Sequence, residues 1–120
     1  QRHGAKVEFV PVNEEHMIDI EEYEKHIDEN TLITSITQVY YLNGFKQDIE
    51  KIAEIAHKKG SLILVDAYQC LGTEPVDVKK MNIDILTSGC LKYLFGIPGI
   101  AFMYVSKSSK TICNWLVWTS

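Results

Sequence analysis

The stretch Leu62-Ile63-Leu64-Val65-Asp66-Ala67-Tyr68-Gln69 decides how this chain folds. Its first four residues are apolar with no polar alternation, which is typical of a strand buried on both faces of a parallel sheet. A carboxylate, Asp66, follows at the carboxyl end of that run. Because open α/β sheets bind ligands at the carboxyl ends of their strands, the stretch predicts a parallel strand that ends in a binding crevice.

A second apolar strand, expected at residues 83–87, leads into a basic residue. The segment Ser88-Gly89-Cys90-Leu91-Lys92 follows this strand, and Tyr93-Leu94-Phe95 comes next. Lys92 therefore has apolar neighbours on its C-terminal side, and an amine that is desolvated by such neighbours is a stronger nucleophile. The two strands together predict that an acid and a lysine meet at one edge of the sheet.

This acid and lysine are the pair that a pyridoxal phosphate (PLP) site requires. The carboxylate of Asp66 keeps the pyridine nitrogen of the cofactor protonated, and the amine of Lys92 holds the cofactor as a Schiff base. In this hypothesis Gln69 faces the same crevice and Ser88 offers its hydroxyl group to the phosphate. Each residue also has an ordinary explanation, since such polar residues often form turns and a lysine is usually a solvated surface residue.

Periodicity and turn signals divide the rest of the chain into alternating strands and helices. Asp19 is expected to cap a helix that runs to about residue 30, with Glu22 as its capping-box partner. Asp48 caps a second helix with one apolar face, and Gly60 ends it. The remaining expected elements are strands at residues 7–12, 32–42 and 100–105, and a turn or short helix at residues 77–82. This alternation predicts an α/β fold, a three-layer sandwich with a mostly parallel sheet.

Composition excludes several classes of protein. The chain has 120 residues, enough for one domain at most, with 46% apolar residues, 23% charged residues and a net charge of −4. The charge gives no basic footprint for nucleic acid or an anionic membrane, and no apolar run reaches the ~20 residues that span a bilayer. Cys70, Cys90 and Cys113 are odd in number and lack metal-binding spacing, so we expect no metal, free thiols and a cytoplasmic location.

Several motifs in a fixed order resemble one enzyme family. They are V-D-A-x-Q at residues 65–69, Pro75-Val76-Asp77-Val78, S-G-x-x-K at residues 88–92, and G-x-P-G-I-A at residues 96–101. Together they resemble the class V aminotransferase group of fold-type I PLP enzymes, which includes cysteine desulfurases, selenocysteine lyases and kynureninase. The resemblance extends from about residue 7 to residue 105. It implies that residues 1–105 are part of a large PLP-binding domain, whereas residues 106–120 depart from the family pattern.

The resemblance also implies roles for individual residues. Lys92 forms the Schiff base with the cofactor and is the catalytic residue that shuttles a proton at the substrate α-carbon. Asp66 pairs with the pyridine nitrogen, Gln69 donates to the ring hydroxyl, and Ser88 contributes to the phosphate cup. The implied substrate is an amino acid, and the implied assembly of the full-length protein is a homodimer.

The reaction stays open among transamination, C–S cleavage and kynureninase-like C–C cleavage. Cysteine desulfurases usually carry a histidine where this chain has Leu91, a serine where it has Gly89 and an asparagine where it has Tyr41. Family members are several times longer than this chain, so the alternative is an inactive α/β fragment or interaction module without turnover of its own. Its apolar tail Trp115-Leu116-Val117-Trp118 suits that alternative. A nucleotide-binding domain lacks support, because no G-x-G-x-x-G or Walker loop follows a strand.

Overall fold

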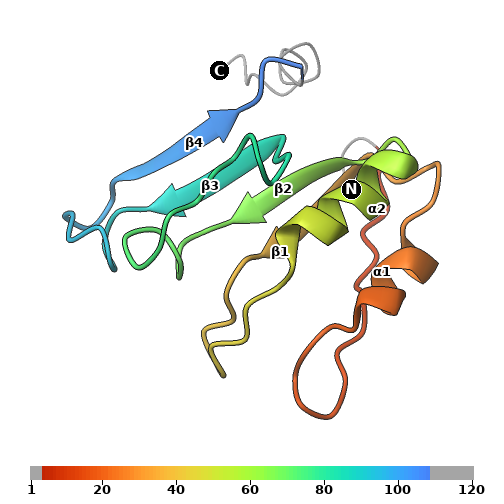
Figure 1. Cartoon of the computed structure of the whole chain (residues 1–120), viewed down its shortest axis with the longest axis horizontal. Helices are drawn as coiled ribbons and strands as arrows, with labels where there is room; N and C mark the ends of the chain where they lie inside the picture. The colour runs from red at the N-terminus through yellow and green to blue at the C-terminus, as the bar shows by residue number, and fades with distance from the viewer. Residues whose placement is uncertain (1–3, 109–120) are drawn as a thin grey trace.

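The computed structural model describes residues 4–108, which form one open sheet with two helices. Figure 1 shows the order of the elements along the chain. They are α1 (Ile20–His26), β1 (Ile33–Thr37), α2 (Ile49–Lys58), β2 (Leu62–Asp66), β3 (Ile85–Gly89) and β4 (Ala101–Val105). The strands lie in the order β1-β2-β3-β4, with β1, β2 and β3 parallel and β4 antiparallel to β3. The predicted α/β fold with a mostly parallel sheet is confirmed.

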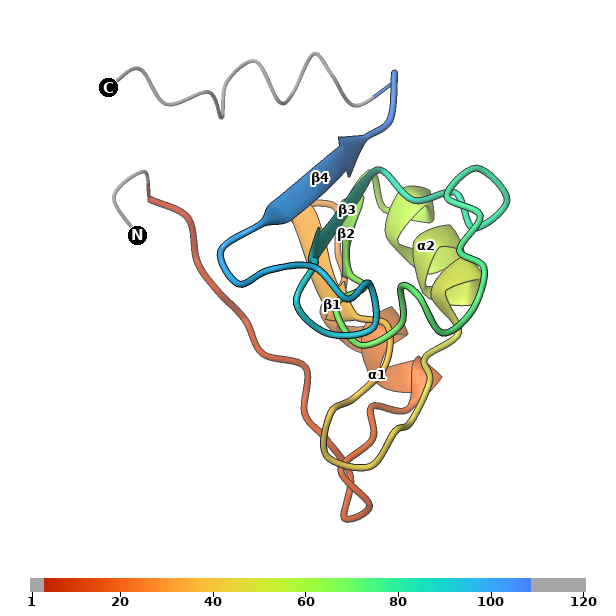
Figure 2. The same ribbon diagram turned by 90° about the vertical axis from the view of Figure 1, so that its left-hand side faces the viewer.

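The two faces of the sheet differ in what covers them. Ile36, Val65 and Leu86 are in register on one face, and all three are buried in the core that α2 covers. Figure 2 shows α2 on this side of the sheet. Asp66 and Thr87, one residue further along, are in register on the opposite face, because successive side chains alternate between the faces of a strand.

The prediction that β2 is buried on both faces is therefore met on one face alone. Ile63 and Val65 are fully buried, whereas Leu62 and Leu64 are half-buried on the opposite face. The three-layer prediction requires helices on both faces of the sheet. Residues 4–108 supply the sheet and one helical layer, so one face of β2 has no helix against it. The face that carries Asp66 is the open one.

Helix α2 forms as its sequence predicts. The Asp48 side chain accepts a hydrogen bond from the backbone N–H of Lys51 at 3.1 Å, which satisfies one of the free donors of the first turn. The apolar face of α2 is buried against β2. Gly60 lies just beyond the helix at φ +79°, a conformation that side chains disfavour, so it ends the helix as expected.

Helix α1 is shorter than predicted, and its capping box is absent. Asp19 holds the N-cap position, but its carboxylate accepts from the Asn13 amide at 3.1 Å instead of from the helix. Glu22 pairs with Lys25 rather than with the N-cap backbone. The helix ends at His26 because a turn around Asp28, which accepts from the N–H of Asn30 and the Thr31 hydroxyl, competes with further helical turns.

The strand predictions need three corrections. β3 runs over Ile85–Gly89 rather than over residues 83–87, so Ser88 and Gly89 lie inside the strand and not after it. Residues 7–12 form no strand: they run as an extended segment in which Phe9 is 86% exposed, because no strand among residues 4–108 pairs with them. β1 ends at Thr37, not near residue 42, because Val39 pairs with Lys46 and residues 38–47 fold back on themselves. The predicted turn at Asn43-Gly44 closes this excursion, with Gly44 at φ +71°.

The C-terminal boundaries are close to prediction. Residues 77–82 form a turn in which Asp77 accepts from the N–H groups of Lys79 and Lys80. β4 ends at Val105, while the division of the chain after residue 105 stays a prediction. The predicted apolar tail at residues 115–118 and Cys113 lie outside the described residues. Within residues 4–108, no helix has the length and apolarity needed to cross a bilayer.

Candidate functional site

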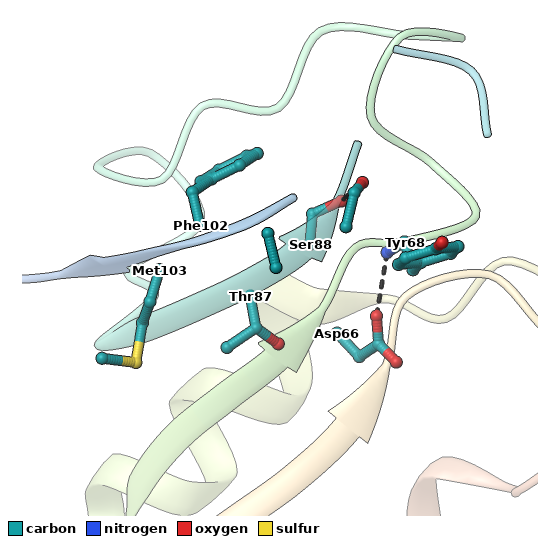
Figure 3. Close-up of a pocket in the computed structure, with 8 residues that line it drawn as sticks. Asp66, Tyr68, Thr87, Ser88, Phe102 and Met103 are labelled. Atoms are coloured by element: carbon teal, nitrogen blue, oxygen red, sulfur yellow. Dashed lines mark hydrogen bonds between the residues drawn. The ribbon is translucent and has the colours of Figure 1, made fainter. Parts of the chain in front are cut away.

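An open cleft of about 540 Å³ lies where β2 and β3 end and β4 begins. Its lining combines polar residues from the strand ends with apolar residues of β4, and Figure 3 shows these side chains around the opening. The residues are Asp66, Tyr68, Thr87, Ser88, Gly89, Ala101, Phe102 and Met103. We call this opening the Asp66 cleft. It lies at the carboxyl ends of the two parallel strands, as the sequence predicts.

Asp66 is held by its own turn. One carboxylate oxygen, Oδ1, accepts a hydrogen bond of 2.9 Å from the backbone N–H of Tyr68, drawn as a dashed line in Figure 3. An aspartate that bonds to the backbone two residues later is a common turn geometry. The second oxygen, Oδ2, receives no hydrogen bond from residues 4–108. The cleft therefore contains a positioned carboxylate that has one oxygen available to a cationic partner.

Lys92 lies in the loop between β3 and β4, at the rim of the cleft. Its side chain is exposed, and the ammonium nitrogen Nζ lies 5.0 Å from the centre of the Tyr68 ring. This distance is within the range of a cation–π contact. Lys92 does not line the cleft itself, but it contacts a residue that does. Tyr68 thus contacts both predicted residues: its backbone N–H donates to Asp66, and its ring faces the Lys92 ammonium group.

Two glycines fix the loop that carries Lys92. A side chain at Gly89 would place its Cβ atom 2.0 Å from a carbon of the Tyr68 ring. A side chain at Gly96 would place its Cβ atom 2.6 Å from the Cβ atom of Cys90, and the Gly96 N–H donates to the Cys90 carbonyl at 2.7 Å. Because the packing at both positions excludes a side chain, the loop is held close against β3 and the Tyr68 ring.

The two other predicted residues differ in their placement. Ser88 lines the cleft but is only 4% exposed, and its hydroxyl donates to the Gly89 carbonyl at 2.9 Å. It lies on the face of β3 that carries Leu86, opposite to Asp66. Gln69 is half-buried in the turn after β2 and does not line the cleft.

Thr87 and Tyr68 are two of the cleft residues that have no role in the sequence hypothesis. Thr87 is in register with Asp66, so its hydroxyl lies on the same face of the sheet as the carboxylate. The period of two along a strand is the signal that finds Thr87, once the register of β2 and β3 is known. Tyr68 lies within the stretch of residues 62–69, but no sequence rule assigns a role to an aromatic residue two positions after an aspartate.

Two cysteines lie near the site, and their surroundings differ. Cys70 is fully buried, and burial, reinforced by its contact with Glu74, raises the pKa of its thiol to about 12. It is therefore a protonated thiol at neutral pH rather than a nucleophile. Cys90 is half-buried in the loop two residues before Lys92. Residues 4–108 contain no cluster of three or more His, Cys, Asp or Glu side chains that is arranged to hold a metal ion.

Comparison with known proteins identifies the family of the chain. A family model described as Aminotransferase class-V matches residues 1–117. The chain is 50% identical over 91 residues to the uncharacterized aminotransferase YcbU of Bacillus subtilis, an alignment that covers 76% of this chain and 25% of that protein. It is 35% identical over 110 residues to a mitosomal cysteine desulfurase of Encephalitozoon cuniculi, covering 92% of this chain and 25% of that protein.

A solved structure agrees with the sequence relatives. The apo structure of the cysteine desulfurase from Thermococcus onnurineus NA1 matches with a TM-score of 0.78 and 29% identity, covering 87% of this chain and 26% of that one. The chain spans about a quarter of the length of the curated relatives it matches. The resemblance predicted from the motifs is confirmed. Because the family model matches almost every residue and the fold agrees with that of a cysteine desulfurase, the chain belongs to the class-V aminotransferase family.

Proposed function

We propose that the full-length protein is a PLP-dependent enzyme that acts on amino acids, and that this chain carries the lysine to which the cofactor is attached. The observation that carries the proposal is the carboxylate of Asp66. It lies in an open cleft with one oxygen unbonded among residues 4–108, beside the aromatic ring that contacts Lys92. The family membership and the names of the relatives support the same conclusion.

The residues of the cleft fit this cofactor. PLP presents a basic ring nitrogen, an aldehyde and a phosphate group. The free oxygen of Asp66 suits the protonated ring nitrogen, and the amine of Lys92 suits the aldehyde. The hydroxyl groups of Thr87 and Ser88 are candidates for the phosphate, and Thr87 has the better placement because it shares the face of Asp66. Gln69 stays a candidate for the ring hydroxyl, and from its half-buried turn it must rotate to reach the cleft.

The roles of the residues follow from their chemistry. When bound, PLP withdraws electrons from the α-carbon of an amino acid. Asp66 would stabilise the positive charge on the ring nitrogen. The Tyr68 N–H supports this role because it fixes the orientation of the carboxylate. Lys92 would move a proton at the substrate α-carbon, because a free amine can act as a general base. Phe102 and Met103 add apolar surface to the lining of the cleft.

Transamination and C–S cleavage are the two reactions that the relatives support. YcbU carries the name of an aminotransferase, whereas the E. cuniculi relative is a cysteine desulfurase. Leu91 and Gly89 depart from the desulfurase pattern, which weakens the assignment of C–S cleavage and leaves the choice of reaction open. A product assay on the full-length protein with cysteine, 2-oxoglutarate as amino acceptor and a thiol reductant separates the two reactions. 3-Mercaptopyruvate, which keeps its sulfur, together with glutamate indicates transamination, whereas alanine or pyruvate together with released sulfide indicates C–S cleavage.

In this proposal, the isolated 120-residue chain is one part of the enzyme and has no turnover of its own. Residues 4–108 line one side of the cleft and leave the other side open. The relatives are about four times longer than this chain. The resemblance to fold-type I enzymes supports a homodimer as the assembly of the full-length protein. The cytoplasmic location and the kynureninase-like alternative stay predictions.

The test of the proposed function is turnover of the full-length protein with Asp66 changed. We expect Asp66→Asn to lower kcat by about 10²–10³-fold, the range found when one preorganised electrostatic partner of a transition state is removed. Glu54→Gln, an exposed change on α2, is the matched control and keeps full activity. Unchanged kcat in Asp66→Asn would remove Asp66 from the site.

A further inference from the structure

Three contacts join Tyr68 to residues of the site. Its backbone N–H donates to Oδ1 of Asp66, as Figure 3 shows. Its ring fills the space next to Gly89, where no side chain fits. The face of the same ring receives the Lys92 ammonium at 5.0 Å from its centre. Its hydroxyl makes no hydrogen bond within residues 4–108, and the ring is outside the hydrophobic core.

The charges of the site are arranged in an unexpected way. Asp66 and Lys92 carry opposite charges and both contact Tyr68, yet they form no ion pair within 4.0 Å in the described chain. An exposed ion pair and an exposed cation–π contact have similar energies, so the ring competes with the carboxylate for the ammonium group. The ammonium lies over the ring, and the second oxygen of Asp66 stays free.

We propose that Tyr68 is a positioning residue that holds Lys92 away from Asp66 in the cofactor-free protein. The inference rests on the proposed function, because it assigns Tyr68 a role toward the same cofactor. An ion pair between Lys92 and Asp66 would block the oxygen that the ring nitrogen of the cofactor needs. The aromatic face prevents this pairing while it keeps the amine at the rim of the cleft.

The required group is the ring and not the hydroxyl. The contact with Lys92 is to the ring face, and the contact with Gly89 is to ring carbons. Tyr68→Phe retains both contacts, whereas Tyr68→Leu removes the aromatic face and lets Lys92 pair with Asp66. The double variant Tyr68→Leu/Lys92→Met removes the competing cation and frees Asp66 again.

The experiment measures the Kd of pyridoxine 5′-phosphate for the cofactor-free, full-length protein. This probe has the ring nitrogen and the phosphate but lacks the aldehyde, so it reports on Asp66 without covalent attachment to Lys92. We expect Tyr68→Phe to bind like the wild type and Tyr68→Leu to bind about two- to five-fold more weakly, the equivalent of an exposed ion pair. The double variant regains wild-type affinity, which also shows that the leucine variant folds.

Each outcome decides the inference. Tyr68→Leu binding as tightly as the wild type overturns it. A weakened Tyr68→Leu that Lys92→Met does not rescue also overturns it, because Tyr68 then acts by direct contact with the probe. Tyr68→Phe binding as weakly as Tyr68→Leu shows that the hydroxyl matters and contradicts the role of the ring. A wild-type protein that does not bind the probe at all refutes the proposed function itself.

Discussion

At the scale of single residues, Gly89 and Tyr68 depend on each other. The resemblance to cysteine desulfurases left Gly89 as an unexplained departure, because those enzymes usually have a serine there. The structure gives a physical reason: a Cβ atom at position 89 would lie 2.0 Å from the Tyr68 ring, far below any real contact distance. The glycine and the aromatic residue therefore form one unit, which neither residue reveals when it is considered alone.

This dependence predicts the effect of adding one methyl group. Gly89→Ala must displace the Tyr68 ring, so we expect it to weaken binding of pyridoxine 5′-phosphate as Tyr68→Leu does. The companion change Tyr68→Ala makes room for the methyl group, so the double variant should be no weaker than Tyr68→Ala alone. A Gly89→Ala protein with wild-type Kd would show that the ring can move without consequence.

Cys70 gives a second prediction at this scale, which concerns pH. Burial raises the pKa of its thiol from 9.0 to about 12, so the folded protein favours the protonated form. The associated stability is complete below about pH 9 and is lost as the pH rises toward about 12. We expect alkylation of Cys70 by iodoacetamide, followed by peptide mapping, to be negligible at pH 8. Rapid reaction at that pH, in protein that remains folded, would show that the thiol is exposed.

At the scale of elements, capping decides which helix keeps its predicted length. Asp48 and Asp19 are both good N-cap residues by sequence, but only Asp48 bonds to its helix, whereas Asp19 accepts from Asn13. Sequence cannot tell which partner a carboxylate takes when two are within reach. The same limit applies to residues 7–12, whose β-rich sequence is right for a strand but has no neighbouring strand among residues 4–108.

The cap of α2 can be tested directly. We expect Asp48→Ala to destabilise the first turn of α2 by about 1 kcal/mol, because the N–H of Lys51 loses its acceptor. Hydrogen exchange of the α2 amides should speed up accordingly. Asp48→Asn, which retains a capping oxygen, is the matched control and should exchange like the wild type. Equal exchange in Asp48→Ala would mean that packing alone holds the helix.

At the scale of the whole molecule, the sheet of residues 4–108 is covered on one face and open on the face that carries Asp66. The sequence predicted the mostly parallel sheet and the position of Asp66, because buried strands and their carboxyl ends leave clear patterns. It could not predict that one face is uncovered, since β2 reads as doubly buried. Nor could it place Ser88 and Thr87 on opposite faces, because that placement needs the register between strands.

This open face predicts self-association of the isolated chain. Met103 is 61% exposed on the face that carries Asp66, and β4 is an edge strand of the sheet that residues 4–108 form. Exposed apolar surface and unpaired strand edges favour association. We expect the isolated 120-residue chain to elute as an oligomer in size-exclusion chromatography, and Met103→Lys to shift it toward the monomer. Glu54→Lys, which adds positive charge on the exposed side of α2, should not shift it. A monomeric wild-type chain would contradict the prediction.

Chemical trapping of the cofactor on its lysine tests directly whether Lys92 carries it. Full-length protein is incubated with PLP, reduced with borohydride and digested, and the modified lysine is identified by mass spectrometry. We expect the label to lie on Lys92, to be lost in Lys92→Ala and to be retained in Lys80→Ala, a control at an exposed lysine of the turn before β3. A label on any other lysine of the wild-type protein, with Lys92 unmodified, would contradict this expectation.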